Sequence, residues 1–479
     1  MSEDYNYAKL GMKSGLEIHQ QLDTHKLFCS CPSFLRTDNP DFEIHRRLHA
    51  IAGETGEIDK AVLHEAKLGK EFIYQGYKDT TCLVELDESP PEIINSEALK
   101  IAIQIALLLN CEILPVTQIM RKTVIDGSNT SGFQRTVLIA KNGWVETESG
   151  KVRIEIVALE EDAARIIEKT DKKDVYRLDR LGIPLVEIAT APDMHTPEQV
   201  KEVALHIGDV LRACKVKRGI GTIRQDINIS IKGHPRVEIK GFQEVKMFIS
   251  TIEKEIERQL ENIKKGELKG EVRKANPDST TDFMRPMPGS ARMYPETDLP
   301  LLKISLGEIN ENKKNLPKLQ GEIKGELEKS GLSDELIKLI LSSGKLEEFK
   351  TLLSINEDAN LIAKMLVLWP KDFSAKIGKD ISKKLGLDVL ESVLNELKKG
   401  VIEKHDVQNI LFEIAKGKPV DDALKIEKLS VDEVEHFIIK LIKEKPGLSI
   451  GAYMGLVMEK FKNKISGKQI MDILKKYVK

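Results

Sequence analysis

The chain has 479 residues, of which 41% are hydrophobic, 31% charged and 5% aromatic, and its formal net charge is −2. This composition predicts a soluble globular protein of two to four domains and excludes fibrous and disordered classes. The longest apolar run, residues 101–109, is too short to cross a bilayer, and the first residues lack a secretory signal, so we expect a cytoplasmic protein without membrane contact.

Residues 13–22 alternate so that Glu17, His19 and Gln21 share one face of a predicted strand. Same-face residues two positions apart are roughly 6.6 Å apart, close enough for a carboxylate and an imidazole to reach one cation. The alternative is an edge strand whose polar face meets solvent.

Five cysteines in a long chain fit a reducing compartment and argue against a disulfide framework. Cys29 and Cys31 are close in sequence, whereas Cys82 and Cys111 are single. A structural zinc site usually has four ligands in paired motifs, so we do not favour zinc from this spacing.

The first 303 residues carry most of the glycine, proline and strand alternation, and helical spacing dominates the remainder. We therefore expect an N-terminal α+β domain over 1–303, a helical domain over 304–405 and a helical tail over 406–479. The predicted strands are 122–125, 136–140, 152–159, 227–231 and 237–239, and the predicted helices are 93–109, 197–214, 251–265, 334–343, 361–369 and 389–397.

Two acidic features follow the central strands. The strand 152–159 runs into Glu160, Glu161 and Asp162, whose mutual repulsion is unfavourable without a cation or basic partner. Glu187 stands inside an apolar strand after a turn at Gly182, and burying it unpaired would cost several kcal/mol.

Glu17, His19, Glu161 and Glu187 together form a set of hard ligands that suits Mg²⁺ or Mn²⁺. The alternative is that each carboxylate pairs with an arginine, such as Arg153, Arg165 or Arg180. We favour the metal for the set as a whole.

Phosphate-binding and hydrolase motifs are missing from the sequence: it has no Walker A motif, no dinucleotide-binding glycine motif after a strand, no zinc-protease motif and no nucleophile elbow. The glycine-containing segments 127–135 and 217–226 could offer backbone amides and arginines to phosphates. Segment 289–298 could similarly contribute Arg292 and Glu296 to a binding site.

Several segments resemble, in order and spacing, the motifs of the B and E subunits of tRNA-dependent amidotransferases. They are Gly15–His19, Leu159–Ala163, Leu178–Ile188 with Pro192 and Asp193, and Arg224–Ser230. Met284–Asp298 is more similar to the archaeal E type than to the bacterial B type. The resemblance covers residues 11 to about 300, and the rest is similar in layout.

This resemblance implies an ATP- and Mg²⁺-dependent enzyme that phosphorylates the γ-carboxylate of Glu-tRNA(Gln), which ammonia then converts to Gln-tRNA(Gln). It also implies a glutamine-synthetase-like cradle domain, followed by a helical domain and a YqeY-like tail that contact tRNA. The implied partner is an asparaginase-like D-type protein that supplies ammonia, in a hetero-oligomer, which we expect to be a heterotetramer.

The resemblance further implies that His19, Glu161 and Glu187 hold a lasting metal ion, with Glu17 serving that ion or a second one. These four residues are the predicted catalytic set. The residues expected to bind nucleotide or substrate are Arg180, Arg224, Asp226, Asn228 and Arg292.

The sequence departs from the E type in one respect, because that type usually carries an inserted domain before the Met284 motif. Here residues 265–271 connect the two sides directly. Two alternatives remain open: a B-type protein with A-type and C-type partners that also acts on Asp-tRNA(Asn), and a non-catalytic scaffold that binds tRNA.

Overall fold

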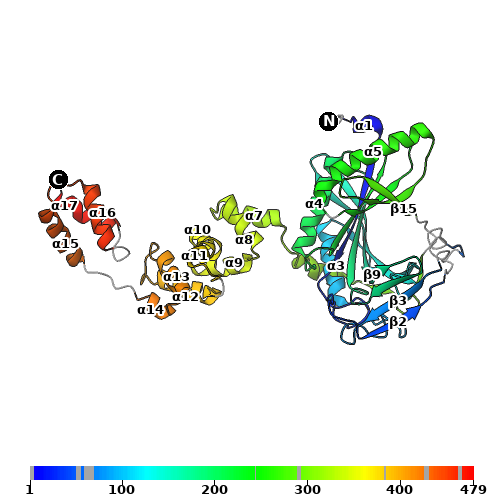
Figure 1. Cartoon of the computed structure of the whole chain (residues 1–479), viewed down its shortest axis with the longest axis horizontal. Coiled ribbons are helices and arrows are strands. Elements are labelled where there is room, and N and C mark those ends of the chain that lie inside the picture. The colour runs from blue at the N-terminus through cyan, green and yellow to red at the C-terminus, as the bar shows by residue number, and fades with distance from the viewer. Residues whose placement is uncertain are drawn as a thin grey trace. The chain divides into compact units, whose positions relative to one another are not determined.

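The computed structural model describes residues 5–49, 56–58, 69–242, 244–287, 293–381, 384–425, 431–461 and 467–478. The chain divides into two compact units, Met1–Gln320 and Gly321–Lys479. The first unit is mixed α/β and the second is helical (Figure 1). The first unit extends beyond residue 303 because helix α6 (Leu306–Lys314) packs against helix α3 (Ser96–Leu108).

Eleven strands form the main sheet of the first unit, in the order β15-β14-β13-β12-β1-β11-β8-β7-β6-β16, with β4 paired to β7. Their bounds are β1 (Lys13–Gln21), β4 (Glu112–Ile113), β6 (Ile119–Thr123), β7 (Phe133–Thr147), β8 (Gly150–Glu161), β11 (Pro184–Thr190), β12 (Ile223–Ser230), β13 (Val237–Phe242), β14 (Glu271–Ala275), β15 (Thr281–Pro286) and β16 (Met293–Pro295). The predicted strands at 122–125, 136–140, 152–159, 227–231 and 237–239 all fall on members of this sheet.

Helices cover one face of this sheet (Figure 1). α3 packs on β7 and β8, α4 (Pro197–Ala213) on β1 and β7, and α5 (Phe248–Lys265) on β12. Thr196 caps α4, because its hydroxyl accepts the Gln199 N–H at 3.2 Å. The Gln199 side chain accepts the N–H of His195, so Thr196 and Gln199 do not form a reciprocal capping box.

The side chains between the helices and the main sheet form the largest apolar core of the first unit. Leu16 and Ile18 of β1 point into this core, as do Val186 and Ile188 of β11. Because strand side chains alternate, the residues between them face the uncovered side of the sheet.

Two smaller sheets and two short helices complete the first unit. β2 (Phe42–Arg46), β3 (Glu71–Gly76), β10 (Lys173–Arg177) and β9 (Arg165–Lys169) pair in that order, around a core that includes Phe72, Tyr74 and Tyr176. The other elements are α1 (Tyr7–Leu10), β5 (Val116–Thr117) paired with β17 (Leu302–Lys303), and the 3₁₀ turn η1 (Val245–Met247).

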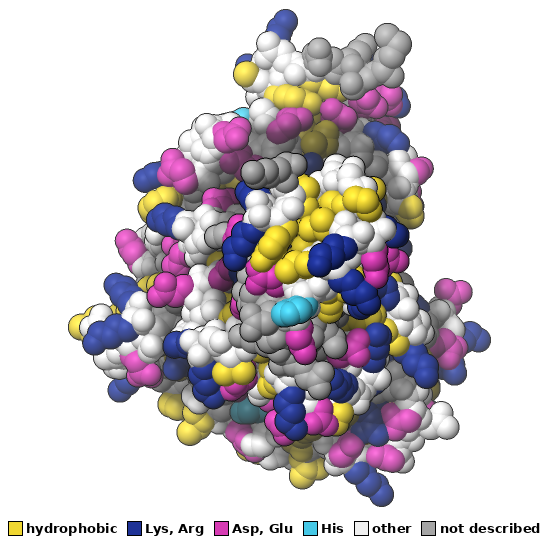
Figure 2. Space-filling view, turned by 90° about the vertical axis from the view of Figure 1, so that its left-hand side faces the viewer, with side chains coloured by type: hydrophobic (Ala, Val, Ile, Leu, Met, Phe, Trp, Pro, Cys, Tyr) yellow, Lys and Arg dark blue, Asp and Glu magenta, His cyan; other side chains and the backbone are white. Residues whose placement is uncertain are grey.

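The second unit contains two apolar cores. The first is built from residues between Leu327 and Ala423, and the second from residues between Val434 and Leu474. The helices are α7 (Gln320–Lys329), α8 (Asp334–Ser342), α9 (Leu346–Ile355), α10 (Ala359–Ala363), α11 (Trp369–Ile377), α12 (Leu387–Lys398), α13 (Val407–Lys416), α14 (Val420–Ala423), α15 (Val431–Glu444), α16 (Ile450–Lys460) and α17 (Gly467–Tyr477). Basic and acidic side chains are interspersed on the face drawn in Figure 2.

The prediction that a helix ends before Pro370 was wrong. A π-helical turn, η2 (Lys364–Leu368), joins α10 to α11, and the chain stays helical through the proline. Pro370 has no N–H to give to the Leu366 carbonyl, and the ammonium group of Lys345 donates to that carbonyl at 3.3 Å instead.

None of the helices that the structure describes is both apolar enough and long enough to cross a membrane.

Gly143 of β7 offers a test of the packing between α3 and the sheet. A Cβ atom there would lie 2.2 Å from Cys111 Sγ and 2.6 Å from the Leu109 carbonyl oxygen. We expect Gly143→Ala to lower the free energy of unfolding of the first unit by about 1–3 kcal/mol through overpacking. Urea unfolding followed by Trp144 fluorescence, in a Trp369→Phe background, measures this change.

Gly307→Ala is the matched control, since Gly307 lies in α6 with the nearest atom 3.7 Å from its ideal Cβ. This helical glycine should tolerate or gain from the substitution. Equal stability of the Gly143→Ala protein and wild type would contradict the close packing.

Candidate active site

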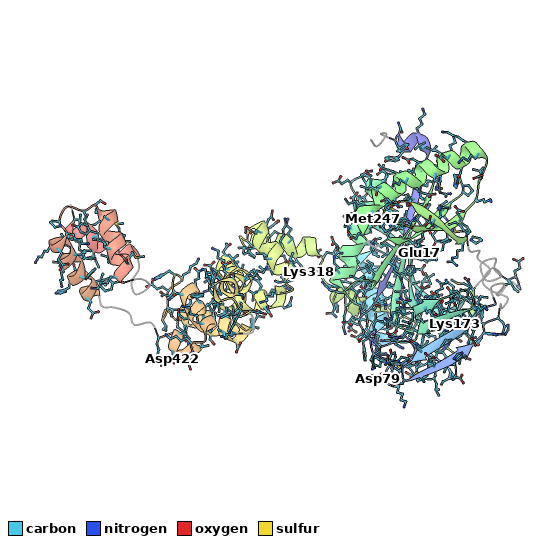
Figure 3. The ribbon with its side chains drawn as sticks, in the orientation of Figure 1. Glu17, Asp79, Lys173, Met247, Lys318 and Asp422 are labelled. Carbon is cyan, nitrogen blue, oxygen red and sulfur yellow. The ribbon has the colours of Figure 1, made fainter. Side chains whose placement is uncertain are left out.

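Glu17, His19 and Glu187, three of the predicted site residues, lie together around β1 on the uncovered face of the main sheet (Figure 3 labels Glu17). β1 pairs antiparallel with β11 on one side and with β12 on the other. In this register, His19 lies opposite Glu187 and Arg224, and Glu17 lies opposite Asp226. Directly opposed residues share a face, so the register brings these side chains together.

His19 is the centre of two groups of potential metal ligands. Its Nε2 atom lies 3.5 Å from Glu17 Oε1 and 3.6 Å from Glu187 Oε2. The ligand atoms of His19, Glu160 and Glu187 lie within 4.8 Å of one another, and so do those of Glu17, His19 and Asp226. Imidazole nitrogen and carboxylate oxygen are ligands for a hard divalent cation.

The structure does not bring Glu161 into this cluster. The backbone alternates along β8, so Glu160 faces His19 and Glu187, while Glu161 faces Arg135. Arg135 Nη1 lies 3.4 Å from Glu161 Oε2, and the Arg135 backbone N–H donates to the same oxygen at 3.3 Å. Glu160 therefore occupies the place that the sequence motif had led us to give to Glu161.

Lys122 of β6 balances part of the acidic charge. Its Nζ atom lies 2.7 Å from Glu160 Oε1 and 3.5 Å from Glu187 Oε2, and Gln134 Nε2 donates to Glu160 Oε2 at 3.1 Å. Burial raises the pKa of Glu160, and repulsion from Glu187 adds to this effect. Burial also acts on Glu187, but Lys122 and His19 outweigh it and hold the pKa of Glu187 well below its usual range.

A second lysine, Lys240, pairs with carboxylates near Glu17. Lys240 of β13 is paired with Asp226 and Glu238, and these carboxylates raise its pKa against the opposing effect of burial. Burial raises the pKa of Glu17, and the neighbouring Glu187 charge raises it further. Like charges are thus held close together on this face.

Asp162, the last residue of the acidic triplet, positions an arginine. Gln21 Nε2 donates to Asp162 Oδ2 at 2.6 Å, and Arg224 Nη2 donates to Asp162 Oδ1 at 2.8 Å. Asp162 is buried, which opposes ionisation, but Arg224 and Arg180 outweigh burial and lower its pKa. The Arg224 guanidinium is held beside the metal-ligand cluster in this way.

A cavity of about 800 Å³ opens over this face. His19, Arg224, Asp226 and Lys240 form its polar part. Glu17 and Asn228 line a neighbouring cavity of about 280 Å³. Glu17 is two residues from His19 on β1, and Asn228 is two residues from Asp226 on β12. The larger cavity lies in the size range of sites for nucleotide-sized ligands.

The predicted nucleotide-binding residues separate into three groups. Arg224 and Asp226 line the larger cavity and Asn228 lines the smaller one. Arg180 instead donates to the backbone carbonyls of Ala163 at 2.7 Å and Ala164 at 2.8 Å, and it lines neither cavity. Arg292 lies outside the described residues.

Three cysteines form a separate cluster, which the sequence spacing had not led us to favour. The ligand atoms of Cys29, Cys31, Cys82 and Glu85 lie within 4.8 Å of one another. Hydrogen bonds from the other two thiols hold the pKa of Cys82 below its usual range. Three sulfur ligands and a carboxylate in one place fit a structural zinc ion.

The buried Lys26 ties this cluster to the sheet that carries the cavity. Its Nζ atom lies 2.7 Å from Glu85 Oε1 and donates to the carbonyls of Thr80 at 2.8 Å and Leu178 at 3.1 Å. Leu178 precedes the turn that leads into β11, so the thiol cluster and the strand of Glu187 share this anchor.

Residues 12–310 match the GatB/GatE catalytic domain, a match that includes both cavities and the thiol cluster. The chain belongs to this family, as its motifs predicted.

Curated relatives extend the similarity to nearly the full length. A Methanocaldococcus jannaschii protein, named as the E-type component of glutamyl-tRNA(Gln) amidotransferase, is 37% identical over 629 residues, covering 99% of this chain and 100% of the relative. Proteins of the same name from Thermococcus sibiricus and Pyrococcus abyssi are 35% and 36% identical, covering 100% and 96% of this chain and 99% and 95% of their own lengths.

The lengths of these alignments can be compared with the expectation that this chain lacks the inserted domain of the E type. An alignment of 629 positions to a chain of 479 residues leaves about 150 positions that only the relative fills. This difference agrees with an insertion in the relatives that this chain lacks.

The thiol cluster predicts that the purified chain contains about one equivalent of zinc. Cys82→Ser should lower the zinc content, measured by inductively coupled plasma mass spectrometry, several-fold, because it removes one of the three sulfur ligands. It should also lower the melting temperature.

Cys214→Ser is the matched control, since Cys214 is a free thiol at the end of α4 that lies outside the cluster. Wild-type protein free of zinc, or a Cys82→Ser protein with unchanged zinc, would contradict the assignment.

Proposed function

We propose that this chain is the ATP-dependent component of a Glu-tRNA(Gln) amidotransferase, which converts Glu-tRNA(Gln) to Gln-tRNA(Gln). The observation that carries this proposal is the convergence of Glu160 and Glu187 on His19, which lines the larger cavity, in a chain whose relatives bear the name of this enzyme.

The proposed reaction has two steps. An oxygen of the glutamyl γ-carboxylate attacks the γ-phosphorus of ATP, the bond to the bridging oxygen breaks, and ADP leaves. Ammonia then attacks the carbonyl carbon of the acyl phosphate, phosphate leaves and a proton is lost, which gives the amide. Such a phosphoryl transfer requires alignment and neutralised charge and no protein nucleophile.

The donor set fits Mg²⁺, with Mn²⁺ as a substitute, because it consists of carboxylate oxygens and one imidazole. His19, Glu160 and Glu187 would hold one ion, and Glu17 with Asp226 would serve a second ion that arrives with ATP. A bound divalent cation supplies neutralisation of the phosphate charge. Arg224, fixed by Asp162, would contact a phosphate oxygen.

Glu160 takes the place of Glu161 as a metal ligand in this scheme. Glu161 acts instead through its ion pair with Arg135, which also donates to the buried Glu296 at 2.8 Å. This arrangement suits a structural anchor beside the site.

The remaining features of the proposal rest on the family. We propose a glutamine-synthetase-like cradle, a description that fits a large sheet covered by helices on one face and open on the other. An asparaginase-like D-type partner would supply ammonia within a heterotetramer, in the cytoplasm. The helical region 304–405 and a YqeY-like tail over 406–479 would contact tRNA, and residues 459–479 contain seven lysines and two acidic residues.

Conversion of Glu-tRNA(Gln) by the purified chain, with ATP, Mg²⁺ and added ammonium, tests the proposal without the partner. We expect Gln-tRNA(Gln) from wild type, and at least a roughly 100-fold lower rate from Glu160→Gln, because the charge that holds the cation is lost. Glu161→Gln should lower the melting temperature and retain measurable conversion.

Glu168→Gln is the matched control, since Glu168 is an exposed carboxylate on β9, outside both cavities. Its rate should equal that of wild type. A protein that binds tRNA but never forms Gln-tRNA(Gln) would favour the scaffold alternative, and an active Glu160→Gln protein beside an inactive, folded Glu161→Gln protein would contradict the proposed roles.

A further inference from the structure

Ile220 lies at the tip of the loop over residues 217–222, at the rim of the larger cavity. Its relative exposure is 107%, and it is one of the residues that line the cavity. A single exposed apolar side chain is ordinary on a protein surface. This one differs because it borders the same cavity as His19 and Asp226.

The two glycines beside Ile220 set its position. Gly219 has a φ of +125° and Gly221 a φ of +82°, and a Cβ atom at either position would meet nothing within 4 Å. The glycines are therefore needed for their backbone conformation and not for space. That conformation carries the Ile220 side chain out to the rim.

The base of this loop is held firmly. The buried side-chain amide of Gln20 donates to the backbone carbonyls of Lys217 at 2.9 Å and Thr222 at 3.1 Å. The Thr222 hydroxyl donates to the Gly219 carbonyl at 2.8 Å. The tip is thus presented from an anchored base, which keeps Ile220 at the cavity.

The cavity has two chemically different parts. His19 and Asp226 of the ligand cluster lie in the polar part with the cationic side chains of Arg224 and Lys240. The large apolar residues are Leu185, Ile220, Ile223 and Phe242. ATP has a similar division, since its triphosphate is charged and the two faces of its flat adenine ring are apolar. A triphosphate at the cluster places the base toward apolar side chains.

We propose that Ile220 packs against the adenine ring of ATP and contributes to the affinity for the nucleotide. This inference rests on the proposed function. Contact with an aliphatic side chain removes apolar surface of both partners from water, and it is the same before and during phosphoryl transfer. Loss of such uniform binding raises the KM and leaves kcat unchanged.

The test uses Ile220→Ser in the full chain, with Glu-tRNA(Gln) and ammonium at saturation. We expect the KM for ATP to rise about five- to tenfold, as for loss of a partly buried aliphatic contact, with kcat within about twofold of wild type. The KM for Glu-tRNA(Gln) should not change. Ile220→Leu should restore the KM for ATP.

Ile93→Ser is the matched control, because Ile93 is 79% exposed and lines neither cavity. Its kinetic constants should equal those of wild type. Thermal unfolding of all three variants verifies that each is folded.

Two results would overturn the inference. An unchanged KM for ATP in Ile220→Ser would show that Ile220 does not contact the adenine ring. A raised KM for Glu-tRNA(Gln) alone would indicate that Ile220 contacts the terminal adenosine of the tRNA instead. Calorimetric titration of wild type and Ile220→Ser with Mg²⁺-ATP separates this inference from the proposed function. Weaker binding by the variant supports the contact even if wild type makes no Gln-tRNA(Gln).

Discussion

Electrostatic repulsion on one face of the main sheet is the constraint on which the site depends. Five carboxylates share this face with Lys122, Lys240 and His19, and they belong to Glu17, Glu160, Glu187, Asp226 and Glu238. With His19 protonated and the Asp162–Arg224 ion pair counted as neutral, these acidic groups outnumber the basic ones by two. A divalent cation matches this excess, and the surrounding sheet keeps the carboxylates from moving apart.

Apolar side chains on the helix-covered face of the same strands stabilise the fold against this repulsion. Leu16, Ile18 and Ile188 are buried under the helices, between the residues that carry the charges. A shift of β1 by one residue would exchange the two sets, burying charges in the core and exposing the apolar side chains. The hydrophobic core therefore fixes the register, and the register fixes the site.

Alternation along β1 and an isolated glutamate in an apolar strand were sufficient to predict Glu17, His19 and Glu187 as one group. These signals are local, because a strand has a period of two. The choice between Glu160 and Glu161 was not settled by the motif, since both are glutamates at a strand end. Continuing the alternation from the buried Leu159 would have placed Glu160 on the open face and Glu161 with the core-side residues.

Features that depend on distant segments could not be predicted in this way. Cys82 is 51 positions from Cys31, and only the folded loops bring their thiols together. The helix through Pro370 depends on Lys345, which belongs to a different part of the chain. Ile220 carries no motif signal by itself, and its place at the cavity follows from an anchor on β1.

Anomalous diffraction from crystals of this chain soaked with Mn²⁺ tests the central claim most directly. The account predicts a manganese peak coordinated by His19, Glu160 and Glu187, with the Glu161–Arg135 ion pair intact. A peak coordinated by Glu161, or no peak on this face of the sheet at saturating Mn²⁺, would contradict the assignment of the metal site.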